Sequence, residues 1–194
     1  MMIAVLQYNS GNIMSVRIAL ERLGQKAVIT SDPEVISGAD KVIIPGVGEA
    51  RSAMKHLKER GLDSVIVSLK QPVLGICLGL QLMCEYSEEG DTECLGIFDT
   101  SVKRFPSGAK VPHMGWNDFI SLNEDPILEG INLSDDVYYV HSYYAGINEY
   151  TTAVCDYGIE FSAAMRRNNF FATQFHPEKS ATPGSLILKN FIAL

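Results

Sequence analysis

The strongest constraint on the fold of this chain is a short apolar run that ends at a glycine-rich turn and is followed directly by a helix. Residues 73–81 read Val-Leu-Gly-Ile-Cys-Leu-Gly-Leu-Gln. The spacing Gly75-x-Cys77-x-Gly79 predicts a sharp strand-to-helix turn, because glycines remove the side chains that would clash there. Such a nucleophile elbow exposes the thiol at a strand end and directs the first N–H groups of the helix at it. The alternative is one more buried cysteine among packing glycines.

A catalytic thiol needs a base, and the chain has four histidines. His176 follows the apolar run 170–175 and precedes Pro177, so a strand is expected to deliver it to the edge of a sheet where proline ends the ladder. Glu178 can reach back to one ring nitrogen and leave the other to take the thiol proton. The sequence predicts a triad of Cys77, His176 and Glu178. The alternative for His-Pro-Glu is a loop without chemistry.

Apolar strands alternate with amphipathic helices in the first half of the chain. The expected elements are 3–8, 13–23, 41–45, 51–60, 72–76 and the elbow helix. Such alternation is typical of a mostly parallel sheet covered on both faces. Between 95 and 175 the strands are shorter, with hairpin-like turns at 106–109 and 156–158, and 182–194 predicts a closing helix. We expect one α/β domain over residues 1–194, a doubly wound, mostly parallel sheet with helices on both faces and an antiparallel β extension. Ligands of such sheets lie at the carboxyl ends of the strands.

Composition excludes several classes of function. A chain of 194 residues with 46% hydrophobic content buries one full core. A net charge of −7 argues against nucleic-acid binding, and no stretch is expected to be a signal peptide or a membrane span. The four cysteines show no zinc-finger spacing, and a catalytic thiol suits a reducing compartment. A cytoplasmic enzyme that acts on small molecules, without nucleic acid or membrane, is expected.

The elbow and the His-Pro-Glu run resemble the class I glutamine amidotransferases, whose triad glutaminase domains carry both motifs. Further strings resemble one branch of that family, the glutaminase subunits that serve a cyclase of histidine biosynthesis. These strings are Tyr8-Asn-Ser-Gly-Asn12, Pro45-Gly-Val-Gly48, Pro112-His-Met-Gly-Trp-Asn117, His141-Ser-Tyr-Tyr144 and Gln174-Phe-His-Pro-Glu-Lys-Ser180. The resemblance covers nearly the whole chain. The elbow alone is shared by many hydrolases, whereas the strings 112–117 and 174–180 are specific to few families and favour this one.

The resemblance implies thiolate attack on the glutamine side-chain amide, loss of ammonia and hydrolysis of a glutamyl thioester, with no metal and no organic cofactor. It assigns the N–H groups of Val47 and Leu78 to an oxyanion hole. From the residues alone, 45–48 reads as an ordinary Pro-Gly turn. If the peptide carrying the Val47 N–H turns away from the site, Gly46 and Gly48 make that flip easy. This hypothesis predicts that the isolated chain is a poor glutaminase.

Glutamine binding is assigned, again by resemblance, to Gly48, Gln81, Glu89, Ser142 and Tyr143. Gln81 lies one helical turn after Cys77 and on the same side, so its amide can hold the backbone groups of glutamine. A polar helix residue that faces a neighbouring loop is the alternative. Glu89 would pair with the substrate ammonium, or else belongs to a solvated acidic turn. Ser142 and Tyr143 would offer main-chain groups to the carboxylate.

The resemblance also implies a partner, a (β/α)8-barrel cyclase subunit that accepts the ammonia through its core. Free ammonia is mostly protonated near neutral pH, so release into water would waste it. The expected interface residues are Asn12, Ser15, Trp116, Tyr138 and Lys179. Trp116 is the only tryptophan, and it is either an exposed anchor or a core ring.

The residues leave other classes of function open. A stand-alone thiol hydrolase would use the same triad but would be active without a partner. A regulatory subunit would keep the fold without the chemistry, although the intact triad speaks against it. Among glutaminases, the subunit of pyridoxal phosphate synthase is the nearest rival, and the string 112–117 argues against it.

Overall fold

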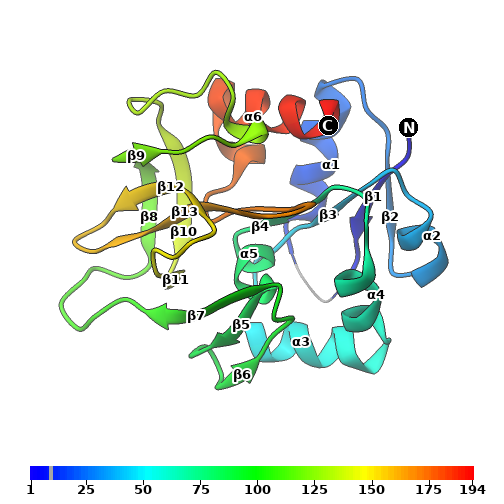
Figure 1. The fold of residues 1–194 in the computed structure, drawn as a ribbon, viewed down its shortest axis with the longest axis horizontal. Coiled ribbons are helices and arrows are strands. Elements are labelled where there is room, and N and C mark those ends of the chain that lie inside the picture. Colours follow the sequence, from blue (N-terminus) through cyan, green and yellow to red (C-terminus); the bar gives the residue numbers. More distant parts are fainter. Residues whose placement is uncertain (9–10) are drawn as a thin grey trace.

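A computed structural model describes residues 1–8 and 11–194, so Asn9 and Ser10 of the string at 8–12 lie outside the described residues. Its centre is an eight-stranded sheet with the order β2-β1-β3-β4-β14-β13-β12-β9 (Figure 1). The first five strands in this order run parallel, and the other three continue the sheet antiparallel. The strands are β1 (Ile3–Leu6), β2 (Ala27–Thr30), β3 (Lys41–Ile44), β4 (Val73–Ile76), β9 (Ser121–Leu122), β12 (Thr151–Asp156), β13 (Glu160–Arg167) and β14 (Phe170–Thr173).

Helices cover both faces of this sheet, as expected for a doubly wound fold (Figure 1). They are α1 (Ile13–Arg22), α2 (Pro33–Ser37), α3 (Ala50–Glu59), α4 (Leu62–Ser68), α5 (Leu78–Met83) and α6 (Ala181–Ala193), with 3-10 turns η1 (Pro126–Leu128) and η2 (Pro177–Lys179). Alternate residues of β1 enter two cores: Ala4 and Leu6 pack with α3 and α4, whereas Ile3 and Val5 pack with α1 and α6. Both faces of the parallel strands are therefore buried, which explains their continuous apolar runs. None of the described helices is long and apolar enough to cross a membrane.

Two small sheets complete the β extension, in which all strand pairs but one are antiparallel. One pairs β8 (His113–Asn117) with β10 (Val137–His141), and the other has the order β11-β7-β5-β6. The strands of the second are β5 (Cys84–Ser87), β6 (Thr92–Glu93), β7 (Phe98–Arg104) and β11 (Tyr143–Ala145). The α/β class with an antiparallel extension is thus confirmed.

Only one of the two turns expected in this region joins a hairpin. The turn at 156–158 does join a hairpin, since Asp156 pairs with Glu160 across β12 and β13. The turn at 106–109 does not, because β7 pairs with β5 and β11, whereas β8 pairs with β10. That expectation was wrong because β5 and β11 occupy both edges of β7, and β8 pairs with β10 instead. Cys84 begins β5 and is buried.

Candidate active site

Cys77 occupies the sharp turn between β4 and α5. Its φ of 52° and ψ of −102° are sparsely populated by residues with a side chain, and its N–H donates to the Thr173 carbonyl at 2.7 Å. A Cβ on Gly75 would lie 2.8 Å from the carbonyl carbon of Gly79, and one on Gly79 would overlap the Ile44 carbonyl oxygen. The glycine spacing therefore serves the close approach that the elbow requires.

His176 and Glu178 form a fully buried pair after β14. Nδ1 of His176 lies 2.7 Å from Oε1 of Glu178, and neither side chain is exposed. Burial alone would lower the pKa of His176, but the negative charges of Cys77 and Glu178 outweigh it and raise this pKa to about 10. The ring then carries a proton at neutral pH, and its positive charge lies beside the sulfur of Cys77.

Asn12, expected at the partner interface, lies at this pair. Its side-chain nitrogen donates to Oε1 of Glu178 and is 3.4 Å from Nδ1 of His176. Asn12 precedes α1, and its carbonyl accepts from the N–H of Ser15 at 3.1 Å. Its backbone is left-handed, with φ at 69°. Nothing local in the sequence indicates that a residue at the start of α1 orients a carboxylate more than 160 positions away.

Gln174 is a second residue that sequence reasoning missed. It is fully buried, and its side-chain nitrogen lies 3.6 Å from Sγ of Cys77. Its Oε1 accepts from Nε2 of Gln81 at 3.2 Å, and the same nitrogen donates to the Tyr143 carbonyl at 2.9 Å. Gln81 therefore does contact a neighbouring segment, but that segment is the start of β11 at Tyr143, which lines the cavity.

A cavity of about 220 Å³ opens in front of Cys77. It is smaller than the pockets of drug-sized ligands, which begin at about 300 Å³, and suits a ligand of amino-acid size. All the predicted oxyanion and glutamine-binding residues line it together with the thiol. The lining residues are Val47, Gly48, Cys77, Leu78, Gln81, Glu89, Pro112, Val140, His141, Ser142 and Tyr143.

The segment 45–48 packs directly on the elbow. A Cβ on Gly46 would lie 2.5 Å from Cβ of Leu78, so only glycine permits this approach. Gly48 has a φ of 140°, which favours glycine as well. The carbonyl of Val47 accepts from the N–H of Gly11 at 3.2 Å. The two residues predicted to form the oxyanion hole are thus neighbours at one end of the cavity.

Glu89 contacts both the cavity and the start of α3. It lines the cavity, and its Oε2 accepts from the N–H of Ala50 at 2.8 Å, at the start of α3. Burial raises the pKa of its carboxyl group, and the hydrogen bond from Ala50 opposes that shift. The carboxylate is therefore held in place by the helix while it faces the cavity, which differs from a freely solvated acidic turn.

The other expected interface residues lie on the surface beside the triad. Trp116 is 54% exposed, which confirms the exposed alternative. Its ring lies 5.9 Å from that of Tyr138, which also contacts the Lys179 ammonium at 5.8 Å. The carbonyl of Tyr138 accepts from the backbone N–H of His176 at 2.9 Å. This aromatic surface is therefore bonded directly to the segment that carries the imidazole.

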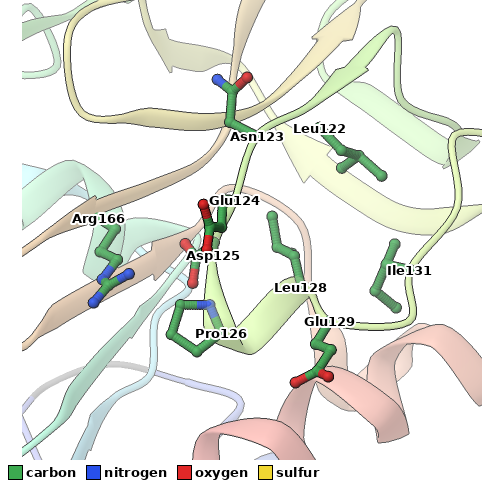
Figure 2. A pocket seen from close by; sticks show the side chains of 9 residues that line it. All are labelled: Leu122, Asn123, Glu124, Asp125, Pro126, Leu128, Glu129, Ile131 and Arg166. Carbon is green, nitrogen blue, oxygen red and sulfur yellow. The ribbon is translucent and has the colours of Figure 1, made fainter.

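A larger hollow of about 760 Å³ lies elsewhere, around η1 (Figure 2). Its charged lining residues are Glu124, Asp125, Glu129 and Arg166. Asp125 uses Oδ1 to cap η1 at the N–H of Ile127, at 3.0 Å. No predicted site residue lines this hollow, so size alone does not identify the active site.

Comparison with known proteins agrees with this geometry. Residues 6–194 match the family described as glutamine amidotransferase class-I. The match spans both the elbow and the His176–Glu178 pair, so the chain belongs to this family and is a glutamine amidotransferase.

Several relatives match the chain over nearly its whole length and are described as imidazole glycerol phosphate synthase subunit HisH. The chain is 58% identical to that of Bacteroides fragilis (strain YCH46), with 100% of both chains covered. It is 54% identical to that of Bacteroides thetaiotaomicron, again with 100% of both covered. The identity to that of Haemophilus influenzae (strain Rd) is 45%, with 98% of this chain and 96% of the relative covered.

Solved structures share the fold at low identity. A structure described as a glutamine amidotransferase matches with a TM-score of 0.77 at 21% identity and covers 98% of this chain and 97% of its own. PurLQS from Thermotoga maritima matches with a TM-score of 0.68 at 15% identity and covers 99% and 97%. These matches support the architecture, whereas the sequence relatives carry the functional argument.

Proposed function

We propose that the chain is the glutaminase subunit of imidazole glycerol phosphate synthase. It hydrolyses glutamine to glutamate and ammonia and passes the ammonia to a cyclase subunit, which makes imidazole glycerol phosphate and AICAR in histidine biosynthesis. The observation that carries the proposal is Cys77 in its elbow, facing a cavity of amino-acid size, with the buried His176–Glu178 pair beside it. The full-length identity to the HisH proteins supports the choice of pathway.

The first half-reaction forms the thioester. The Cys77 thiolate attacks the amide carbon of glutamine, and the electron pair of the carbonyl bond moves onto oxygen. The N–H groups of Val47 and Leu78 bind that oxyanion. His176 then gives the proton of Nε2 to the amide nitrogen as the carbon–nitrogen bond breaks, so that neutral ammonia leaves.

The second half-reaction releases glutamate. A water molecule gives a proton to Nε2 of His176 while its oxygen attacks the thioester carbon. The carbon–sulfur bond breaks, Cys77 leaves as a thiolate, and the ring is again an imidazolium. Glu178 stabilises the charged ring through Nδ1, 2.7 Å away.

Substrate recognition uses the remaining lining residues. Glu89 binds the ammonium group, because its carboxylate is held at the cavity by Ala50. Main-chain groups of Ser142 and Tyr143 bind the carboxylate, and Gln81 and Gly48 hold the backbone of the substrate. Gln81 now donates to Tyr143 and Gln174, so its Oε1 is the atom that can accept from the substrate.

The partner surface is the face formed by Trp116, Tyr138 and Lys179, with Asn12 and Ser15 at its edge. An aromatic pair with a cation beside it is typical of interface anchors. The occupant is the (β/α)8-barrel cyclase. All four cysteines are free, which fits the reducing cytosol where we place the reaction.

Glutamate release from glutamine tests the proposal. It is measured for the purified chain alone, and then with the cyclase subunit and its nucleotide substrate or product, with Cys77→Ala as the blank. We expect little activity alone and strong activation in the complex that vanishes in Cys77→Ala. Strong activity alone would favour a stand-alone hydrolase, and indifference to this cyclase would favour another synthase.

A further inference from the structure

Two buried histidines outside the proposed triad form a hydrogen-bonded chain that ends at the cavity. His113 and His141 face each other across β8 and β10, and Nδ1 of His113 lies 3.1 Å from Nε2 of His141. Nδ1 of His141 lies 2.7 Å from the carbonyl oxygen of Tyr143. At the other end, the side-chain nitrogen of Asn117 lies 3.4 Å from Nε2 of His113.

The Tyr143 carbonyl at one end determines which atom is donor and which is acceptor in each of these hydrogen bonds. A carbonyl oxygen only accepts, so the proton of His141 is on Nδ1, and its Nε2 accepts from the Nδ1–H of His113. Nε2 of His113 is then an acceptor and receives a proton from the amide of Asn117. That amide also donates to the Asp156 carbonyl at 2.9 Å. One neutral tautomer of each ring therefore satisfies the whole chain.

Packing holds both rings in this arrangement. His113 lies between Tyr139 and Tyr157, with ring centroids 4.7 and 4.0 Å away and nearly parallel planes. His141 packs against Phe105 at 5.3 Å. Burial lowers the pKa of His113 to about 4 and that of His141 to about 3. Both rings therefore stay neutral at physiological pH, as the hydrogen-bond pattern requires.

The hydrogen-bonded chain of side chains ends where the two small sheets meet. β10 finishes at His141 and β11 begins at Tyr143 (Figure 1), and Ser142 between them belongs to neither ladder. Ser142 accepts one backbone hydrogen bond, from Phe105 at 3.2 Å. Ser142 and Tyr143 line the cavity, and the Tyr143 carbonyl also accepts from Gln81. Besides these backbone bonds and the pairing of Tyr143 with Arg104, two side chains, His141 and Gln81, hold this short segment through the Tyr143 carbonyl.

We propose that His113 is a positioning residue for glutamine. Acting through His141, it fixes the backbone of Ser142 and Tyr143 against the α-carboxylate of the substrate. The inference rests on the proposed function, because it takes glutamine as the ligand of the cavity. His113 does not line the cavity, so its effect is on substrate binding rather than on the bond-breaking steps at Cys77.

Two substitutions distinguish the effect of the hydrogen-bond donor of His113 from the effect of its aromatic ring. His113→Phe keeps an aromatic ring between the two tyrosines but removes the donor to His141, whereas His113→Asn keeps a donor near the place of Nδ1. In the complex with the cyclase, we expect His113→Phe to raise KM for glutamine about 10-fold with kcat within about twofold. His113→Asn should stay within about threefold of the wild-type KM. His56→Phe, the same change on α3, is the matched control.

An altered substrate gives the decisive comparison. Glutaminamide lacks the α-carboxylate, so His113→Phe should leave its KM within about twofold of the wild-type value. An equal increase in KM for both substrates, or a loss of kcat with KM unchanged, would overturn the inference. A wild-type complex that does not hydrolyse glutamine would overturn the proposed function itself.

A second variant keeps the test open if His113→Phe does not fold. Asn117→Leu removes the amide at the partly exposed end of the chain and leaves both rings in place. We expect it to raise KM for glutamine about threefold with kcat unchanged. An unaltered KM in a folded Asn117→Leu protein would contradict a positioning role for this hydrogen-bonded chain.

Discussion

Asn12 and His176 share one oxygen atom of Glu178. Oε1 of Glu178 accepts both from the imidazole, at 2.7 Å, and from the side-chain amide of Asn12. Two donors stabilise a carboxylate better than one, and they fix its orientation toward the ring. Since Asn12 begins α1 at the proposed partner face, a displacement of that helix end changes how Glu178 supports His176.

Glu178→Gln tests the charge of this carboxylate. The amide keeps the size of the side chain but removes the negative charge that raises the pKa of His176. We expect kcat of the complex to fall by about 10²- to 10⁴-fold, as for other triads that lose this group, with little change in KM. Glutamate release measured by steady-state kinetics gives both constants.

Glu129→Gln is the matched control, because Glu129 is an exposed carboxylate in the hollow around η1. It should keep wild-type kcat. A Glu178→Gln enzyme with more than a fifth of wild-type kcat would show that Glu178 does not support the imidazolium as proposed.

Gly46→Ala tests the contact between the oxyanion segment and the elbow. The new methyl group would lie 2.5 Å from Cβ of Leu78 and 2.9 Å from the nitrogen of Gly79, so the backbone of 45–48 must move away. Displacing one oxyanion donor costs about 10²- to 10³-fold in kcat, so we expect kcat to fall far more than KM rises. Gly146→Ala, where a methyl group meets no atom within 4 Å, should leave both constants unchanged. Equal effects of the two variants would argue against this placement of the oxyanion hole.

The parts of the site that the sequence predicts are local. Gly75, Cys77 and Gly79 lie within five positions and specify a turn whose sterics follow from glycine alone. His176 and Glu178 are two positions apart, so one pair of residues indicates both the base and its orienting group. The alternation of strands and helices likewise gives the parallel sheet, because each unit is continuous along the chain.

The parts that the sequence does not predict come from long-range contacts. The Asn12 amide meets His176 across 164 positions, and Gln174 meets Cys77 across 97. Neither residue type nor spacing marks these partners. The turn at 106–109 failed as a hairpin because β7 pairs with β5, which precedes it, and with β11, whereas β8 pairs with β10.

Trp116→Ala tests the partner surface. The ring is 54% exposed and touches Tyr138 edge-on, so its removal creates no cavity in the core. Loss of an aromatic anchor typically costs about 2 kcal/mol or more of binding free energy, which is a roughly 30-fold weaker affinity for the cyclase. Isothermal titration of the two purified subunits measures this, and the thermal midpoint of the variant alone should match wild type. Exposed Ile147, 51% accessible, gives the control Ile147→Ala; equal affinities for the two variants would place the partner elsewhere.

The two neutral histidines also predict how stability depends on pH. In the folded chain the pKa of His113 is lowered to about 4 and that of His141 to about 3, chiefly by burial and further, for His141, by the neighbouring His113 and His176. In the unfolded chain both groups titrate at about 6.5. The unfolded state therefore binds more protons between these values, so the stability gained from the neutral pair is complete above pH 6.5 and is lost as pH falls toward 4. Each histidine adds up to about 1.4 kcal/mol per pH unit to the slope of unfolding free energy in that window.

Urea unfolding between pH 5 and 7 measures how the unfolding free energy depends on pH. This pH dependence should be shallower by about this amount in His113→Phe than in wild type, whereas His56→Phe should keep the wild-type dependence. Parallel pH dependences in wild type and His113→Phe would mean that His113 titrates alike in the folded and the unfolded protein, which contradicts the neutral ring that the hydrogen-bonded chain from Asn117 to Tyr143 requires.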